Sequence, residues 1–204
     1  MFRLIRKNPV VDLLVTIATA IAIAFVVQLW FVKPFQVPSA SMQPTLAVGD
    51  YILGVRFLYH FTDPKRGSIL VFHPNGKGSD YFEADTPAEP YFVKRLIGLP
   101  NEVVGSHDGK VYVCADGRFP ADPSSPTTTP GCRFLDEPYV HGQPTFSCGG
   151  GGDYQVHVPP DHYLMLGDNR TNSLDGRCWG TIPRRQIVGR AFLTYWPLTR
   201  ISLY

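Results

Sequence analysis

The chain has 204 residues, which is enough for one folded domain of ordinary size with an added segment. Its 19 Lys and Arg against 17 Asp and Glu leave a formal net charge of +2. This near balance argues against a strongly basic nucleic-acid binder, and the 44% hydrophobic content argues against an acidic disordered chain. The 19 Gly and 19 Pro residues predict many turns and few long soluble helices.

The N-terminus contains the longest apolar run, residues 10–32, which carries a single charge at Asp12. A helix over this run is about 34 Å long, enough to cross a hydrocarbon core of roughly 30 Å. Arg3, Arg6 and Lys7 precede the run, and the positive-inside rule then places residues 1–9 in the cytoplasm. We therefore predict one transmembrane anchor in the lipid bilayer, with the rest of the chain outside the cytoplasm.

A cleaved secretory signal peptide is the alternative interpretation of the same run. The apolar region of such a peptide covers only about 7–15 residues, whereas this run is longer. Pro34 and Pro38 also make the following segment a poor cleavage region. These features favour an anchor that stays attached.

Beyond the anchor, short apolar stretches rich in Val, Ile, Phe and Tyr alternate with Gly, Pro, Asp and Asn. This punctuation is typical of strands joined by turns. We predict an all-β or mostly β domain with strands near residues 51–55, 68–72, 91–97, 102–104, 110–113, 163–166 and 186–196.

Residues 116–152 differ from the rest because Pro and Gly are concentrated there, with four consecutive glycines at 149–152. We predict turns and irregular loop for this stretch, within a loop-rich subdomain at 105–155 inserted into a β-domain formed by 33–104 and 156–204. Cross-links through Cys132 and Cys148 would support it. The sequence has four cysteines, Cys114, Cys132, Cys148 and Cys178. Four cysteines allow three complete connectivities, so their pairing stays open.

The stretch PSASMQPTL, residues 38–46, lies just outside the predicted membrane. Ser39 and Ser41 flank a small residue in this turn-prone sequence. A tight loop of this kind can present a nucleophilic hydroxyl with backbone N–H groups aimed at an oxyanion. A solvated turn is the common alternative for Ser beside Pro.

Lys94 lies within a strand-like apolar run, YFVKRLIGLP, residues 91–100. A free lysine titrates near 10.4 and is protonated at neutral pH, but burial can lower its pKa by roughly 3–5 units. A neutral amine could take the proton of a serine hydroxyl. The alternative is an edge-strand lysine with its ammonium in water.

The stretch GDNRTNSLDGRCWG, residues 167–180, is dense in polar groups that would be costly to bury without partners. It predicts either an exposed loop or an ordered network that supports a site. Asp175 and Arg177 could pair with Arg95, and Ser173 could hydrogen-bond the amine of a lysine.

Five stretches together resemble the bacterial type I signal peptidases: PSASMQPTL, GDYILGVRF, KRGSILVF, YFVKRLIGLP and GDNRTNSLDGRCWG, in this order after one anchor. The resemblance covers roughly residues 10–104 and 156–204. It implies that residues 33–104 and 156–204 form a catalytic, signal-peptidase-like antiparallel β-domain with no cofactor and no metal. It also implies removal of signal peptides from exported preproteins, with the secretion machinery as a possible partner. Three positions depart from the usual pattern: Ser68, Thr171 and Cys178.

The resemblance also implies roles for individual residues. Ser41 matches the family nucleophile, Lys94 the general base, and Ser39 the serine that forms the oxyanion hole together with the Ser41 backbone N–H. A preference for small residues in an Ala-X-Ala pattern before the cut is implied as well. The supporting residues would be Ser173, Asp175, Arg177, Arg95 and Gly167, and the substrate-binding residues Val37, Pro38, Met42, Leu46, Phe92 and Val93.

Other functions fit parts of the sequence. A specialised Ser–Lys maturation peptidase would use the same pair on one dedicated substrate. Cys178, between Arg177 and Trp179, is a candidate catalytic thiol, although cysteines outside the cell are more often structural. His157 and His162 lack metal-ligand spacing. A membrane-tethered binding module without catalysis fits the anchor and the β-domain equally well.

Overall fold

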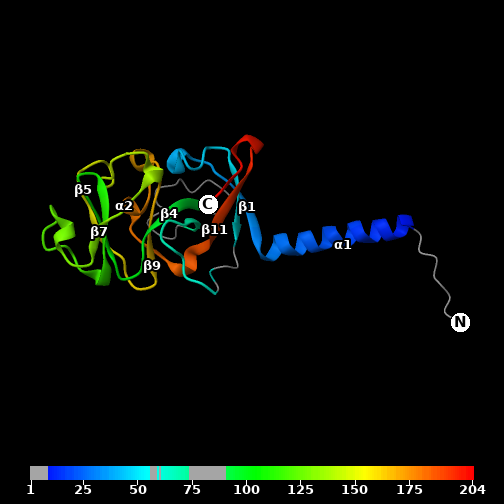
Figure 1. Ribbon diagram of the computed structural model, residues 1–204, viewed down its shortest axis with the longest axis horizontal. Coiled ribbons are helices and arrows are strands. Elements are labelled where there is room, and N and C mark those ends of the chain that lie inside the picture. Colours follow the sequence, from blue (N-terminus) through cyan, green and yellow to red (C-terminus); the bar gives the residue numbers. More distant parts are fainter. Residues whose placement is uncertain (1–8, 56–58, 60, 74–90) are drawn as a thin grey trace.

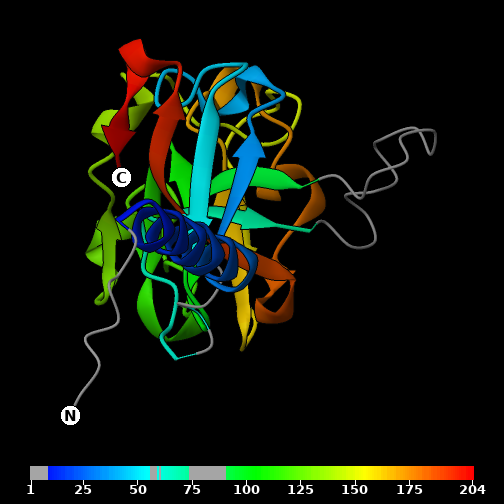
Figure 2. The same cartoon turned by 90° about the vertical axis from the view of Figure 1, so that its right-hand side faces the viewer.

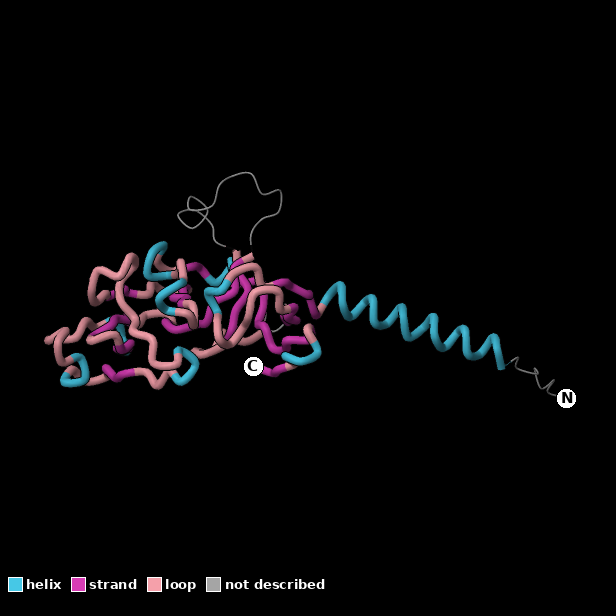
Figure 3. Tube along the Cα trace, turned by 90° about the horizontal axis from the view of Figure 1, so that it is seen from above, coloured by secondary structure: helices cyan, strands magenta, loops and turns pink. Residues whose placement is uncertain are grey.

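The computed structural model describes residues 9–55, 59, 61–73 and 91–204. Its helix α1, Pro9–Trp30, projects away from a body built of strands (Figures 1 and 3). Its most apolar window, residues 9–26, has a mean hydropathy of 2.3 and is not buried against the other residues that the structure describes. Length and composition suit a membrane span, as predicted. The basic residues Arg3, Arg6 and Lys7 lie outside the described residues.

The helix ends at Trp30, two residues before the predicted boundary at residue 32. Pro34 explains this difference, because proline disfavours helical backbone at the residue before it and cannot donate its own backbone hydrogen bond. The chain instead enters strand β1 at Val32. The β-sheet body therefore begins directly after the end of the helix.

Two antiparallel sheets make up the body, as the strand and turn punctuation predicts. The larger sheet has the order β1-β2-β11-β3-β4-β9-β10, with β12 paired to β11, and Figure 2 shows β1, β2 and β11 side by side. Its strands are β1 Val32–Gln36, β2 Tyr51–Val55, β3 Ile69–Phe72, β4 Phe92–Gly98, β9 His162–Leu166, β10 Ile182–Pro183, β11 Ile187–Trp196 and β12 Ser202–Leu203.

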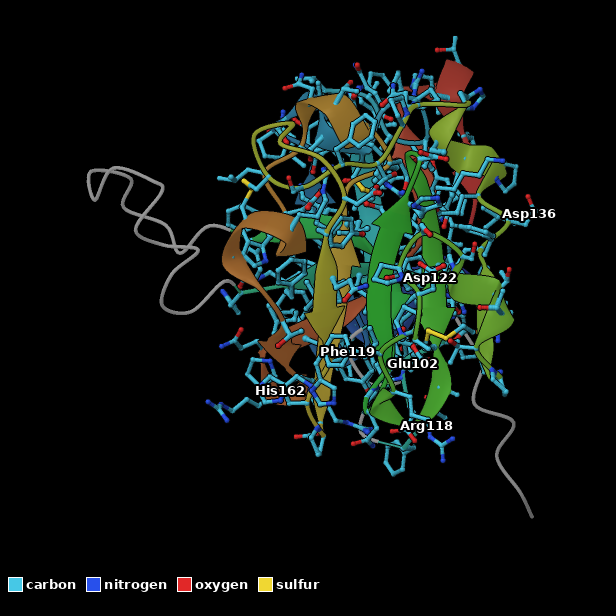
Figure 4. The ribbon with its side chains drawn as sticks, turned by 90° about the vertical axis from the view of Figure 1, so that its left-hand side faces the viewer. Glu102, Arg118, Phe119, Asp122, Asp136 and His162 are labelled. Atoms are coloured by element: carbon cyan, nitrogen blue, oxygen red, sulfur yellow. A yellow bond between two sulfur atoms is a disulfide. The ribbon has the colours of Figure 1, made fainter. Side chains whose placement is uncertain are left out.

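The smaller sheet has the order β7-β6-β5-β8 and lies at the end of the body far from α1 (Figure 1). Figure 4 views this end of the molecule. Its strands are β5 Val103–His107, β6 Lys110–Cys114, β7 Cys132–Phe134 and β8 Gln155–His157. The predicted boundaries at 104/105 and 155/156 fall within β5 and β8.

The expectation of turns alone across residues 116–152 is wrong, because β7 lies within that stretch. It pairs with β6 in a register that sets Cys132 opposite Cys114. Short helical turns fill much of the remaining chain. The short helices are η1 Ala40–Met42, η4 Ala115–Gly117, η5 Pro126–Thr128, η6 Pro138–Val140, η7 Arg170–Asn172, α2 Gly176–Trp179, η8 Arg184–Gln186 and η9 Leu198–Arg200.

Buried apolar side chains join the two sheets. One cluster combines Ile97 of β4 and Leu164 of β9 with Val104 of β5 and Val113 of β6. Burial of each such side chain contributes roughly 1.5–3 kcal/mol. The smaller sheet is therefore packed onto the larger one through a shared core.

Two disulfides join Cys114 to Cys132 and Cys148 to Cys178. All four cysteines of the sequence are bridged, so the interpretation of Cys178 as a catalytic thiol is wrong. The second bridge ties the glycine-rich loop after Cys148 to α2, in the polar stretch 167–180. A weakly apolar loop thus gains a covalent attachment close to the predicted site.

Removal of the Cys148–Cys178 bridge should lower the free energy of unfolding by about 3–4 kcal/mol, because its partners are 30 residues apart. Denaturant titration of a C148S/C178S variant measures this. The C114S/C132S control opens a shorter separation of 18 residues and should lose about 3 kcal/mol. Peptide mapping under non-reducing conditions checks the pairing, and any other connectivity would contradict it.

Candidate active site

Ser41 lies in the short helix η1 between strands β1 and β2. Its neighbour Met42 is buried, and Leu46 donates its backbone N–H to the Met42 carbonyl at 2.9 Å. These anchors fix the loop on the core while the Ser41 side chain faces a cavity and is only 7% exposed. The expectation of a solvated turn is therefore wrong for this serine.

Lys94 occupies the middle of β4, which has β3 on one side and β9 on the other. The residue is 3% exposed, and its Nζ donates a hydrogen bond of 2.5 Å to Ser41 Oγ. The alternative of an edge-strand lysine in water is wrong, because this strand is internal and its lysine is buried.

The environment of Lys94 lowers its pKa from 10.5 to about 8. Burial is the main cause, because removal from water disfavours the ammonium form. The carboxylates of Asp175 and Asp168 oppose this by raising the pKa, and Arg177 lowers it further. A useful share of the amine is thereby neutral near physiological pH.

The hydroxyl of Ser39 lies 3.1 Å from Ser41 Oγ, within hydrogen-bond distance. Backbone contacts fix this part of the loop from the other side. Asn169 donates its backbone N–H to the Ser41 carbonyl and its side-chain amide to the Ala40 carbonyl, each at 3.1 Å. The polar stretch 167–180 thus holds η1 in place.

A cavity of about 520 Å³ opens beside these residues. Five of the six predicted substrate-binding residues line it, together with Ser39, Ser41 and Lys94: Val37, Pro38, Met42, Phe92 and Val93. The sixth prediction, Leu46, is wrong, because its side chain is fully buried in the core beneath η1. The structure adds Ala40, Tyr91, Asn172 and Leu174 to the lining.

Gly167 brings its backbone against η1, as the resemblance implies. A Cβ atom at this position would lie 2.5 Å from the Ser41 carbonyl oxygen, so the close approach requires glycine. Asp175 accepts the Gly167 N–H at 2.9 Å and pairs with Arg177, which donates from Nε and Nη2 at 2.8 Å each. Asp175 also caps the N-terminus of α2.

The predicted pairing of Arg95 with Asp175 is wrong, because Arg95 pairs with Asp168. Its Nε and Nη2 donate to the two carboxylate oxygens at 2.8 and 2.6 Å. The strand register explains this choice, since Arg95 lies opposite Leu166 of β9, two residues before Asp168. Asp175 is meanwhile occupied by Arg177 and the Gly167 N–H.

Ser173 does not form the predicted hydrogen bond with Lys94. Its Oγ is buried and, in the part of the chain that the structure describes, has no hydrogen-bond partner. It lies against Gly167, where an added Cβ would approach Oγ to 2.1 Å. Ser173 therefore packs beside the network that supports Ser41.

The fold and the site together define a class of protein: a mostly β enzyme in which a serine hydroxyl and a lysine amine are buried in contact. The family model for signal peptidase, peptidase S26, matches residues 10–196. The chain belongs to this family, and it is a serine endopeptidase of the hydrolase class.

Individual relatives support the family assignment. The probable signal peptidase I-2 of Synechocystis sp. is 35% identical over 97% of this chain and 78% of its own length. The signal peptidase I of Leptolyngbya laminosa is 33% identical over 96% of this chain and 84% of its own. A crystal structure of a signal peptidase I from Enterococcus faecalis is 23% identical, covers 63% of this chain and 97% of its own, and has a TM-score of 0.41.

Proposed function

We propose that this chain removes N-terminal signal peptides from exported preproteins with Ser41 as nucleophile and Lys94 as general base. The hydrogen bond of 2.5 Å between two buried side chains supports this proposal most directly. A binding module has no need to bury a lysine amine against a serine hydroxyl, because the buried charge is costly. The same contact is what proton transfer from a serine requires.

The reaction begins with Lys94 as a neutral amine that accepts the Ser41 proton while Oγ attacks the scissile carbonyl. The Ser39 hydroxyl and the Ser41 backbone N–H stabilise the resulting oxyanion. The Lys94 ammonium then gives its proton to the departing amine, which leaves an acyl ester on Ser41. Water attacks this ester with Lys94 again as base, and the signal peptide is released as a carboxylic acid.

The resemblance to the signal peptidases implies small side chains at the first and third positions before the cut, and the apolar cavity supports an apolar residue there. An extended substrate would enter by strand addition, with alternate side chains pointing into the cavity. Met42 and Val93 are both almost fully buried, so the cavity floor is fixed and apolar. Alanine at both positions, the Ala-X-Ala pattern, fits such a surface.

The apolar helix α1 supports a membrane location for the reaction. With residues 1–9 in the cytoplasm, the single span places the catalytic domain on the opposite side, where translocated preproteins emerge. Both the enzyme and its substrate are then held in one bilayer, which raises their effective concentration. The lipid bilayer and the secretion machinery are the partners that this arrangement implies.

A preprotein with Ala-X-Ala before its cleavage site should be cut by membranes that contain the wild-type chain. Leucine in place of the alanine directly before the cut should slow cleavage by about 100-fold or more, because the cavity must accept a larger side chain. Leucine at the middle position of the pattern is the matched control and should leave the rate unchanged. Gel analysis of the released fragment measures both.

The same assay separates the proposed function from its alternatives. A specialised maturation peptidase would leave the generic preprotein intact and cut only its dedicated substrate. A binding module would retain the preprotein without cutting it. Either result would overturn the proposed function.

A further inference from the structure

One turn of the inserted subdomain reaches across to the catalytic network. This turn, residues 137–140, contains the short helix η6 and follows Asp136, which is labelled in Figure 4. Two of its side chains, Glu137 and Tyr139, contact two different arginines of the catalytic domain. The contacts give the insertion a physical link to Ser41 and Lys94.

Glu137 forms the first contact, a buried ion pair with Arg170. The two terminal nitrogens of Arg170 donate to the two carboxylate oxygens of Glu137 at 2.9 and 2.5 Å. The arginine side chain is fully buried and that of Glu137 is 7% exposed. Thr145, also in the insertion, accepts a further bond from Arg170 at 2.6 Å. A buried cation with this many partners has a fixed position.

Arg170 also connects this ion pair to the segment that contacts the nucleophile. Its Nε donates to the Gly167 carbonyl at 3.0 Å. Gly167 in turn lies so close to the Ser41 carbonyl that no Cβ fits between them. Glu137, Arg170, Gly167 and Ser41 therefore form one continuous series of contacts from the insertion to the nucleophile.

Tyr139 forms the second contact, on the side of the base. Its ring covers the Arg95 guanidinium at 4.0 Å, and its hydroxyl donates to Glu137 at 2.8 Å. Arg95 holds Asp168 in a two-point pair, and the Asp168 carboxylate acts on the Lys94 amine. The same turn thus supports the surroundings of Lys94.

We propose that Glu137 and Tyr139 are positioning residues of the peptidase and that the insertion completes the active site. This inference rests on the proposed function, because it assigns the turn a role in the Ser41 and Lys94 reaction. Without the turn, the loop at 167–170 loses its outer support and the nucleophile loses its fixed distance from the base. Such a distance matters because a displacement of about 1 Å can reduce a rate by roughly 100-fold.

Glu137→Gln should lower kcat for the Ala-X-Ala preprotein by about 10-fold or more, with KM within about twofold of wild type. The matched control is Glu102→Gln. Glu102, labelled in Figure 4, forms a partly buried pair with Arg66, and neither residue lines the cavity, so its loss should leave kcat unchanged. A Glu137→Gln variant no slower than Glu102→Gln would overturn the positioning role.

A double variant separates positioning from simple stabilisation. Glu137→Gln alone leaves the Arg170 cation buried without its partner, whereas E137Q/R170M removes both charges and should recover the melting temperature. The kcat should stay low in the double variant, because methionine cannot donate to the Gly167 carbonyl. Recovery of kcat together with the melting temperature would overturn the proposal.

Two substitutions of Tyr139 test the second contact. Tyr139→Phe keeps the ring over Arg95 and should retain kcat within about threefold, whereas Tyr139→Leu should lower it about 10-fold at unchanged KM. Equal rates for the two would overturn the role of the ring. An inactive Ser41→Ala enzyme beside a fully active Glu137→Gln enzyme would reject this inference alone, while an active Ser41→Ala enzyme would reject the proposed function.

Discussion

Lys94→Ala should reduce cleavage of an Ala-X-Ala preprotein by at least about 1,000-fold, and Ser41→Ala should do the same. Alanine at position 94 removes the group that lies 2.5 Å from Ser41 Oγ and that accepts its proton in the proposed reaction. Alanine at position 41 removes the atom that would form the acyl ester. Because the nucleophile and the base act as one unit, the double variant should lose no more activity than either single variant.

Replacement of an exposed lysine by alanine is the matched control for Lys94→Ala. Lys110 begins strand β6 and is exposed, so Lys110→Ala should cleave at the wild-type rate. Both dyad variants should still bind the preprotein, since the apolar residues that line the cavity, Val37, Met42 and Val93 among them, are unchanged. Wild-type cleavage by either Lys94→Ala or Ser41→Ala would end the assignment of this pair.

The pH dependence of kcat/KM provides a second measurement on Lys94. The proposed reaction needs the neutral amine, so the rate should rise with pH and level off above the pKa of about 8. At pH 7 roughly a tenth of the enzyme would have a neutral lysine. A rate that still rises steeply at pH 10 would show that the base has the ordinary pKa of an exposed lysine.

The lowered pKa also affects folding, and its sign can be worked out. Between about pH 8 and 10.5 the unfolded chain binds a proton at Lys94 that the folded chain does not. The contribution of this residue to stability therefore rises with pH across that window. Below about pH 8 both states bind the proton, and the cost of the buried ammonium is present in full.

Strong local patterns in the sequence predicted most of the fold. Strands such as β2 and β11 follow stretches rich in β-branched and aromatic residues, and α1 follows a long apolar run with a single charge. Strands β1 and β10 contain Pro, and β7 has only three residues, so none of them shows a clear alternation. Their positions are decided by pairing with neighbouring strands, which a local pattern does not record.

The sequence also located the residues of the candidate site but not all of their partners. Ser41 and Lys94 are 53 positions apart, and the family resemblance supplied the pair that the structure brings into contact. Arg95 and Asp168 are 73 positions apart, and which carboxylate Arg95 binds depends on the register between β4 and β9. Glu137 gave no local signal, because its buried arginine partner lies in another subdomain.

Gly167→Ala should lower kcat/KM by about 100-fold while the chain remains folded. The added Cβ would lie 2.5 Å from the Ser41 carbonyl oxygen and 2.1 Å from Ser173 Oγ. Neither position is compatible with van der Waals contact, so either the Gly167 loop or η1 must move. Movement of η1 would separate Ser41 from Lys94. Lys94 cannot follow, because its strand β4 is held between β3 and β9.

Gly151→Ala is the matched control for this substitution, because its Cβ would meet only Ser147 Oγ at 3.4 Å. It should keep full activity and an unchanged melting temperature. A second variant, G167A/S173G, removes the clash with the serine but leaves the one with the Ser41 carbonyl. If steric contact with η1 limits the rate, this variant should regain stability without regaining kcat/KM. Full activity in Gly167→Ala would instead show that the loop carrying Ser41 tolerates displacement, and the close approach of Gly167 would then have no part in holding the nucleophile.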